Sequence, residues 1–241
     1  QNLLGVHGTP DPTNPKGHWE DIACIEANKA IIREAIDYPT EWEWMNPVCI
    51  QGESISNGTR EVMRHAIQPL QNQGRWGFKD PRNCITLQAW CEELGRPTVI
   101  VGVRNPVEVA RSLYTRNSIP YVDGIRTWYE YYSTVLKTVA QRNLRAIFVD
   151  YEINLADPVA QFQRLAHCLE IQLEADSEAC NIVQDFVDPA LRRNRFETPS
   201  VESLKEIFQE EAIHNELEAI VELYRHLQTF SQFELTSQEP E

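Results

Sequence analysis

Apolar residues recur at helical spacing through the N-terminal part of the chain. The pattern from about residue 20 to residue 37 gives a helix with one apolar side, and similar patterns predict helices at 54–71 and 83–94. Residues 8–18 are rich in Pro, Gly, Asn and Asp, which is typical of a loop. Between the second and third helices, RWGFKD at residues 75–80 predicts a short strand that ends in charge.

The middle of the chain alternates short β-branched runs with helical patterns. Residues 98–103 read TVIVGV and predict a strand buried on both faces of a parallel sheet, and residues 145–150 predict a second buried strand. Pro106 can start a helix that continues to about residue 117, because a first helical turn tolerates proline. A further helix is expected over 122–142. Strand, helix, helix, strand is the order found in parallel sheets.

From Asp157 onward the pattern is mostly helical. We expect helices over 157–169, near 176–186 and over 200–230, the last with a break near Glu210. A chain of 241 residues, 42% of them hydrophobic, can bury one sizeable core. The sequence therefore predicts a single α/β domain over the whole chain, with a central parallel sheet and a mostly helical C-terminal part.

The formal net charge of −14 narrows the range of partners. A surface that is negative on average repels nucleic acids and anionic membranes, whereas a small anion can still bind to a local cluster of cations. No apolar run has the length of a membrane span. The six cysteines form no C-x-x-C pair and are typical of free thiols in a reducing compartment, so we expect a cytoplasmic protein without a bound metal.

Two predicted strands end in a cation, and ligands bind outside the carboxyl ends of parallel strands. Lys79 and Arg104 would there make a local positive site. Ser112 lies about two turns into the helix after Arg104, where a hydroxyl and a guanidinium can hold a phosphate together. The alternative is structural. Arg104 would then pair with an acid and Ser112 would bond its own backbone. Lys79 would form an ion pair with Asp80 or Glu92.

Four aromatic residues lie within five positions of the helix predicted over 122–142, namely Trp128, Tyr129, Tyr131 and Tyr132. They cannot all share one helix face. We therefore expect some of them to pack in the core and another to border a pocket for an acceptor substrate.

Five segments of the chain resemble those of sulfotransferases that use 3′-phosphoadenosine 5′-phosphosulfate (PAPS). RNPVEVARSL at 104–113 resembles the stretch that holds the 3′-phosphate, and GFKDPR at 77–82 resembles the Lys-Asp-Pro segment of tyrosylprotein and related bacterial sulfotransferases. The other three segments are NPKGHWED at 14–21, FVDYEINLADPVAQFQRLAHCLEI at 148–171 and FVDPALRRNR at 186–195. All five stand in the family's order, which makes the resemblance fairly specific.

The resemblance implies a P-loop-type, three-layer α/β/α fold. It also implies transfer of a sulfuryl group from PAPS to a hydroxyl or amine acceptor, which leaves 3′,5′-diphosphoadenosine. Arg104 and Ser112 would bind the 3′-phosphate, Arg192 and Arg193 of the basic loop would contact it as well, and Lys79 would stabilise charge near the bridging oxygen. The family's glycine-rich loop, which cradles the 5′-phosphosulfate, is expected shortly before the first residue, so we expect a chain that is cut upstream.

Glu20 is the candidate for the base that takes the proton of the acceptor, with His18 and Asp21 as further candidates beside it. The helix dipole alone also favours an acidic residue in a first helical turn. Three functions stay open: a sulfotransferase, a non-catalytic nucleotide-binding or interaction module derived from one, and a P-loop kinase. The pair of Arg104 and Ser112 disfavours the kinase.

Overall fold

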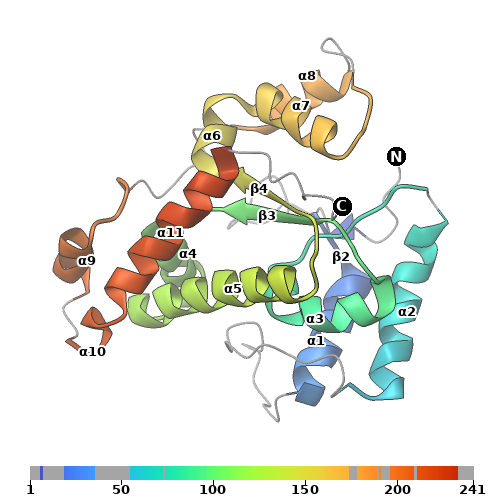
Figure 1. Cartoon of the computed structure of the whole chain (residues 1–241), viewed down its shortest axis with the longest axis horizontal. Coiled ribbons are helices and arrows are strands. Elements are labelled where there is room, and N and C mark those ends of the chain that lie inside the picture. The colour runs from blue at the N-terminus through green and yellow to red at the C-terminus, as the bar shows by residue number, and fades with distance from the viewer. Residues whose placement is uncertain are drawn as a thin grey trace, which may run out of the picture. The chain divides into compact units, whose positions relative to one another are not determined.

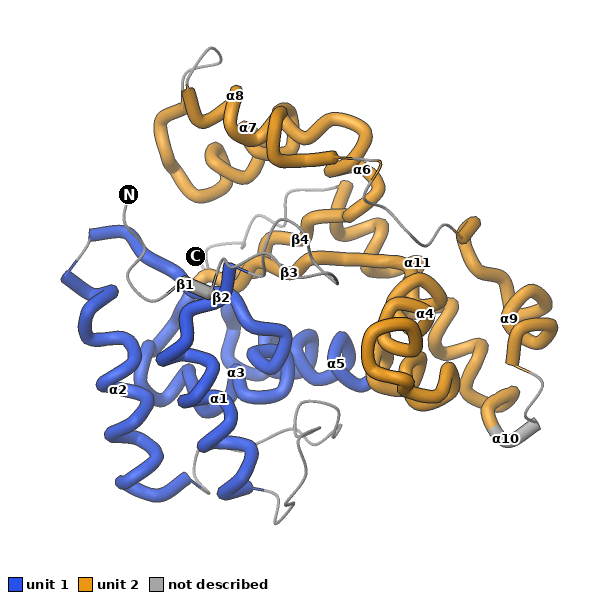
Figure 2. Tube along the Cα trace, turned by 180° about the vertical axis from the view of Figure 1, so that it is seen from behind, with its two compact units in different colours: residues 1–97, 130–144 blue, residues 98–129, 145–241 orange. Residues whose placement is uncertain are grey.

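The structure is a computed structural model, and it describes most of the chain (Figure 1). The described residues are 6–7, 19–35, 55–72, 74–173, 178–188, 190, 196–208 and 211–232. The chain divides into two compact units, of which unit 1 contains residues 1–97 and 130–144 and unit 2 contains residues 98–129 and 145–241 (Figure 2). The single domain expected from the sequence stays a prediction.

Unit 1 is built around three helices that contact one another, α1 (Ile22–Ala35), α2 (Asn57–Gln71) and α3 (Asn83–Leu94). All three were predicted from the apolar pattern and are confirmed. The hydroxyl of Ser56 starts α2 by accepting a hydrogen bond from the amide of Thr59 at 3.3 Å. The core of the unit includes fully buried Ile31, Met63, Ile85 and Trp90.

Unit 1 also contains a short antiparallel pair of strands that the sequence did not predict. Strand β1 (Val6–His7) pairs with β2 (Glu20–Asp21), so that His7 lies opposite Glu20. Strand β2 leads directly into α1. The N-terminal end of α1 is therefore tied to a strand, and Glu20 lies just before the helix instead of inside its first turn.

The strand predicted at residues 75–80 is wrong, because residues 76–80 have no regular secondary structure. Trp76 and Phe78 alternate as in a strand, yet both pack against the core of unit 1, where the Phe78 ring lies 4.9 Å from that of Trp90. This segment has no ladder of backbone hydrogen bonds. Side-chain packing and the hydrogen bonds of Asp80 fix its position instead.

Unit 2 contains the parallel pair that the sequence predicted. Strand β3 (Val99–Val103) runs parallel to β4 (Ala146–Asp150), with Val99 opposite Ala146 and Val103 opposite Asp150. The connection runs through α4 (Pro106–Asn117) and α5 (Tyr121–Gln141), as expected. The described part of the chain is thus mostly helical α/β with a two-stranded parallel sheet.

One expectation about β3 is wrong. Val101 and Val103 are buried, but Ile100 between them is 49% exposed, so β3 is covered on one face only. Strand β4 is largely buried, as predicted. In α5, Gly124 allows close approach to α4, since a Cβ atom there would lie 3.0 Å from the Cα atom of Ala110.

The C-terminal part of unit 2 is helical, as predicted, and α11 contacts both strands and α9. An additional short helix, α6, follows β4 directly. The bounds are α6 (Tyr151–Ala156), α7 (Pro158–Cys168), α8 (Glu178–Phe186), α9 (Val201–Ile207), α10 (Glu211–His214) and α11 (Leu217–Gln232). The break expected near Glu210 lies outside the described residues. Among the helices described, none combines the length and the apolar character that crossing a membrane requires.

Candidate functional site

The carboxyl ends of β3 and β4 lie side by side in unit 2, and each leads into a capped helix. Asn105 precedes α4 and its side-chain oxygen accepts a hydrogen bond from the amide of Val107 at 3.0 Å. Asp150 ends β4, and its carboxylate accepts hydrogen bonds from the amides of Glu152 and Ile153. These bonds cap the start of α6. The register of the two strands therefore brings two helix starts to one edge of the sheet.

Arg104 lies at this edge, and described residues on α4, α5 and α6 contact it. Its guanidinium carbon is 4.4 Å from the centre of the Tyr151 ring, and its Nε donates to Oε2 of Glu108 at 3.3 Å. The indole of Trp128 donates to the carbonyl oxygen of Arg104 at 2.9 Å. The Arg104 side chain is still 28% exposed. It is an oriented cation that a ligand can reach.

The sequence left open that Arg104 has a structural role and pairs with an acid. Its interaction with Glu108 is such an ion pair. The Glu108 side chain is fully buried, so Arg104 and a backbone amide compensate its charge inside the protein. Ser112 lies one turn beyond Glu108 on the same side of α4 and is half-buried. Arg104 precedes α4 and contacts Glu108, and Ser112, the second predicted phosphate ligand, lies one turn further along the helix than Glu108.

The first half of α4 also holds the chain that follows the predicted basic loop. Oε1 of Glu108 accepts from the amide of Phe196 at 3.0 Å, and the Asn105 amide donates to the carbonyl oxygen of Glu197 at 3.0 Å. The guanidinium carbon of Arg111 is 5.3 Å from the centre of the Phe196 ring. Arg192 and Arg193 lie outside the described residues and stay predictions.

In unit 1 the structure brings the two predicted catalytic residues together. Nζ of Lys79 lies 2.5 Å from Oε1 of Glu20, although 59 positions separate them in sequence. The lysine side chain is 59% exposed and the glutamate side chain 12% exposed. The partners named for Lys79 in the structural alternative are engaged elsewhere, because Asp80 pairs with Arg82 and Glu92 pairs with Arg142.

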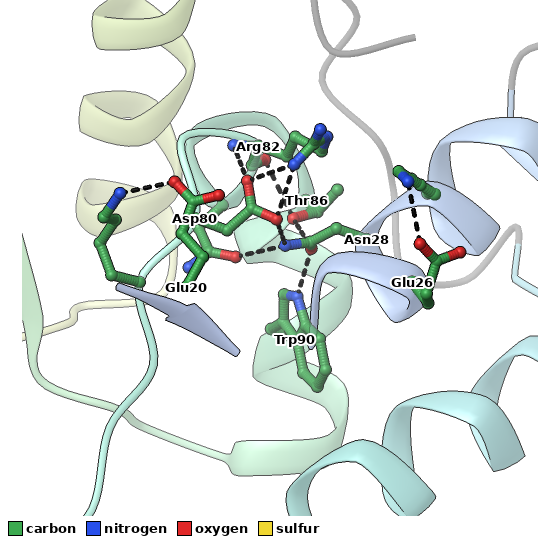
Figure 3. A network of polar contacts seen from close by, with 10 residues as sticks. Glu20, Glu26, Asn28, Asp80, Arg82, Thr86 and Trp90 are labelled. Atoms are coloured by element: carbon green, nitrogen blue, oxygen red, sulfur yellow. Dashed lines mark hydrogen bonds and ion pairs between the residues drawn. The ribbon is translucent and has the colours of Figure 1, made fainter. Parts of the chain in front are cut away.

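Asp80, the residue after Lys79, is anchored by a buried polar network (Figure 3). Its carboxylate accepts from the Asn28 amide at 3.0 Å, from the backbone amide of Arg82 at 2.9 Å and from Nη1 of Arg82 at 2.9 Å. Asn28 lies on α1 and is fully buried. These bonds hold the segment that carries Lys79 against α1 and the start of α3.

Asn28 is the centre of this network, since both ends of its amide are used. Its oxygen accepts from the hydroxyl of Thr86 at 2.7 Å and from the indole of Trp90 at 2.8 Å. Its nitrogen donates to Asn83 at 2.8 Å as well as to Asp80. A buried network with so many satisfied members specifies one arrangement of the polar side chains.

The neighbours of Glu20 have other roles or are not described. Oδ1 of Asp21 accepts from the amide of Cys24 at 3.0 Å and so caps the start of α1, which does not favour it as the base. His18 lies outside the described residues. Within the ranges that the structure describes, no three His, Cys, Asp or Glu side chains are grouped as metal ligands would be.

Sequence reasoning did not identify Asn28 or Arg82 in the region around Lys79 of unit 1, or Tyr151 in the region around Arg104 of unit 2. Tyr151 and Arg82 belong to two of the resembling segments, and this membership was the available signal for them. For Asn28 the one hint is an asparagine on the apolar side of a predicted helix. Trp128 and Tyr131 are buried, which confirms that part of the aromatic cluster packs in the core.

Comparison with protein-family models, with curated proteins and with solved structures finds no match to this chain.

Proposed function

We propose that the chain is a PAPS-dependent sulfotransferase with a P-loop-type, three-layer α/β/α architecture. The observation that carries the proposal is Arg104, an oriented and partly exposed guanidinium at the carboxyl end of a parallel strand, just before a helix. A guanidinium in this place suits the 3′-phosphate of a nucleotide, and the hydroxyl of Ser112 on the following helix suits it as a second donor.

The roles of the remaining residues follow from the chemistry of sulfuryl transfer. The acceptor oxygen or nitrogen attacks sulfur, the bond from sulfur to the phosphate oxygen breaks, and a base takes the acceptor's proton. Glu20 is the proposed base and Lys79 the proposed cation at the bridging oxygen. Their close ion pair supports a shared function, because in the absence of substrate each charge compensates the other.

The same ion pair also supports a second candidate, a binding module without transfer activity. A lysine and a glutamate that neutralise each other at 2.5 Å can equally be a surface ion pair. The two functions differ in one measurable product. A sulfotransferase converts PAPS to 3′,5′-diphosphoadenosine faster when an acceptor is added, whereas a binding module does not.

The proposed nucleotide site can be tested by thermal unfolding with two ligands, 3′,5′-diphosphoadenosine and 5′-AMP. Both contain adenosine and a 5′-phosphate, so a larger rise in melting temperature with the bisphosphate reports the 3′-phosphate alone. We expect this larger rise in the wild-type chain and expect Arg104→Ala to remove it.

Arg116→Ala is the matched control, because Arg116 lies in the last turn of the same helix. It should keep the difference between the two ligands. Equal shifts with both nucleotides in the wild-type chain would refute the proposal, as would an unchanged difference in Arg104→Ala.

A further inference from the structure

Unit 1 contains two buried polar atoms that have no hydrogen-bond partner among the described residues. They are the hydroxyl oxygen of Tyr131 on α5 and Nε of Arg82 at the start of α3. Tyr131 is 8% exposed and the Arg82 side chain 16% exposed. Buried polar groups nearly always have a partner, so each such atom in a folded protein needs an explanation.

The two atoms belong to one cluster. Burial raises the pKa of the Tyr131 hydroxyl well above its ordinary value, and the neighbouring groups that act on it include Cys84, Arg82 and Asp80. Tyr131 also packs into the same apolar core as Ile85 and Trp90, which belong to the helix that Arg82 starts. The Tyr131 hydroxyl therefore keeps its proton and lies within electrostatic reach of Arg82.

Among the described residues, two side-chain acceptors of the buried network, Asp80 and Asn28, are already engaged. Asp80 accepts from Asn28 and from both the amide and Nη1 of Arg82. The Asn28 oxygen accepts from Thr86 and Trp90. Among the described residues, the cluster lacks a further acceptor, since Arg82 can only donate and the proton of the Tyr131 hydroxyl is donated to no partner.

We propose that Arg82 and Tyr131 form a binding subsite for an oxygen atom of a sulfate or phosphate group. Such an oxygen carries lone pairs and no proton, so it can accept from both donors at once. Asp80 compensates the charge of Arg82. The subsite therefore recognises the sulfate or phosphate oxygen through directed hydrogen bonds more than through net charge. The choice of ligand class rests on the proposed function, in which a sulfuryl group is transferred next to Lys79, three residues before Arg82.

Thermal unfolding during a titration with inorganic sulfate, at constant ionic strength made up with chloride, tests the subsite by itself. Sulfate also stabilises proteins non-specifically, and that part is common to all variants. Tyr131→Phe removes the hydroxyl alone. We expect the variant without sulfate to melt at or above the wild-type temperature, because it no longer buries an unpartnered hydroxyl. We expect its sulfate affinity to fall about tenfold, as for the loss of one hydrogen bond to a charged group.

Tyr132→Phe is the matched control, because it removes a hydroxyl from the next residue of α5, and it should keep the wild-type response to sulfate. Arg82→Lys keeps a cation opposite Asp80 but has no Nε donor, so it should weaken the response as Tyr131→Phe does. An identical sulfate response in wild type and Tyr131→Phe would overturn the subsite. That result would leave the comparison of 3′,5′-diphosphoadenosine with 5′-AMP unaffected, so failure of the subsite and failure of the proposed function are distinguishable.

Discussion

The two regions that carry the predicted chemistry are held in different ways. In unit 2, Arg104 directly follows a paired strand, the capping residue of α4 is the next one and Glu108 is four positions away, while Trp128 and Tyr151 contact Arg104 from α5 and α6. In unit 1, the segment that carries Lys79 has no regular structure and depends on side chains from distant positions. Asn28 is 52 residues from Asp80, and Glu20 is 59 residues from Lys79.

This difference predicts where each region is sensitive to mutation. A site built on strand ends and helix caps keeps its shape through backbone hydrogen bonds, so one side-chain change alters it locally. A site built on a buried network of side chains loses several bonds when one member is removed. The two regions should therefore respond very differently to substitutions of comparable size.

The largest effect is expected from Asp80→Ala in unit 1. The change leaves the mostly buried Arg82 guanidinium without its counter-charge and the Asn28 amide with one acceptor, Asn83, instead of two. Breaking a buried ion pair in this way costs roughly 3–5 kcal/mol of the free energy of unfolding. Urea unfolding measures it. Asp80→Asn keeps one acceptor oxygen and should lose less, and if both variants unfold like the wild type, the network does not hold this segment.

A smaller effect is expected from Glu108→Ala in unit 2. The variant removes the acceptor of the Phe196 amide and the partner of Arg104, while the Asn105 and Arg111 contacts to the same segment remain. We expect a loss of about 2 kcal/mol, the cost of one unsatisfied buried group. Glu108→Gln keeps an acceptor oxygen and should unfold at a urea concentration between those of the wild type and Glu108→Ala. If Glu108→Ala lost more free energy of unfolding than Asp80→Ala, the claim that unit 1 is the more sensitive region would be wrong.

The next largest effect on stability is expected in unit 1 at alkaline pH, through the thiol of Cys84. Burial first, and then the charge of Asp80, raises the pKa of Cys84 from 9.0 to about 12. Above pH 9.0 the unfolded chain releases this proton while the folded chain retains it, so stability falls as the pH rises toward about 12. Unfolding in urea across this range should show a shallower decline for Cys84→Ala. An equal slope in both proteins would mean that the thiol is not buried.

The smallest effect on stability is expected from Lys79→Met and Glu20→Gln. The lysine side chain is 59% exposed, and exposed ion pairs contribute little, so the free energy of unfolding should change by about 0.5 kcal/mol or less. Production of 3′,5′-diphosphoadenosine from PAPS should nevertheless fall by at least about tenfold in each variant. Unchanged production in both would remove these residues from the proposed chemistry and favour the binding module.

The sequence predicted the region of unit 2 better than that of unit 1, for physical reasons. The β-branched runs before Arg104 and before Asp150 are local signals of strands, and Pro106 is a local signal of a helix start. The alternation of Trp76 and Phe78 was also a local signal, but packing against Trp90 determined the outcome there.

Other features had no local signal at all. The buried amide of Asn28 gains its role from partners more than 50 positions away, as the bonds to Asp80, Thr86 and Trp90 show. The helix α6 forms because Asp150 both ends a strand and caps the next turn, and a pattern of apolar residues does not show such a double role. Contacts of this kind become visible only once the chain is folded.

The central claim is that Arg104 makes the carboxyl edge of β3 and β4 a site for a 3′-phosphate. Isothermal titration calorimetry with 3′,5′-diphosphoadenosine and with 5′-AMP, on the wild-type chain and on Arg104→Gln, measures this directly. The account predicts that the wild-type chain binds the bisphosphate at least about tenfold more tightly than 5′-AMP, a difference of about 1.4 kcal/mol that one charged hydrogen bond supplies, and that Arg104→Gln binds both alike. Equal affinities in the wild-type chain, or a preference that survives in Arg104→Gln, would contradict it.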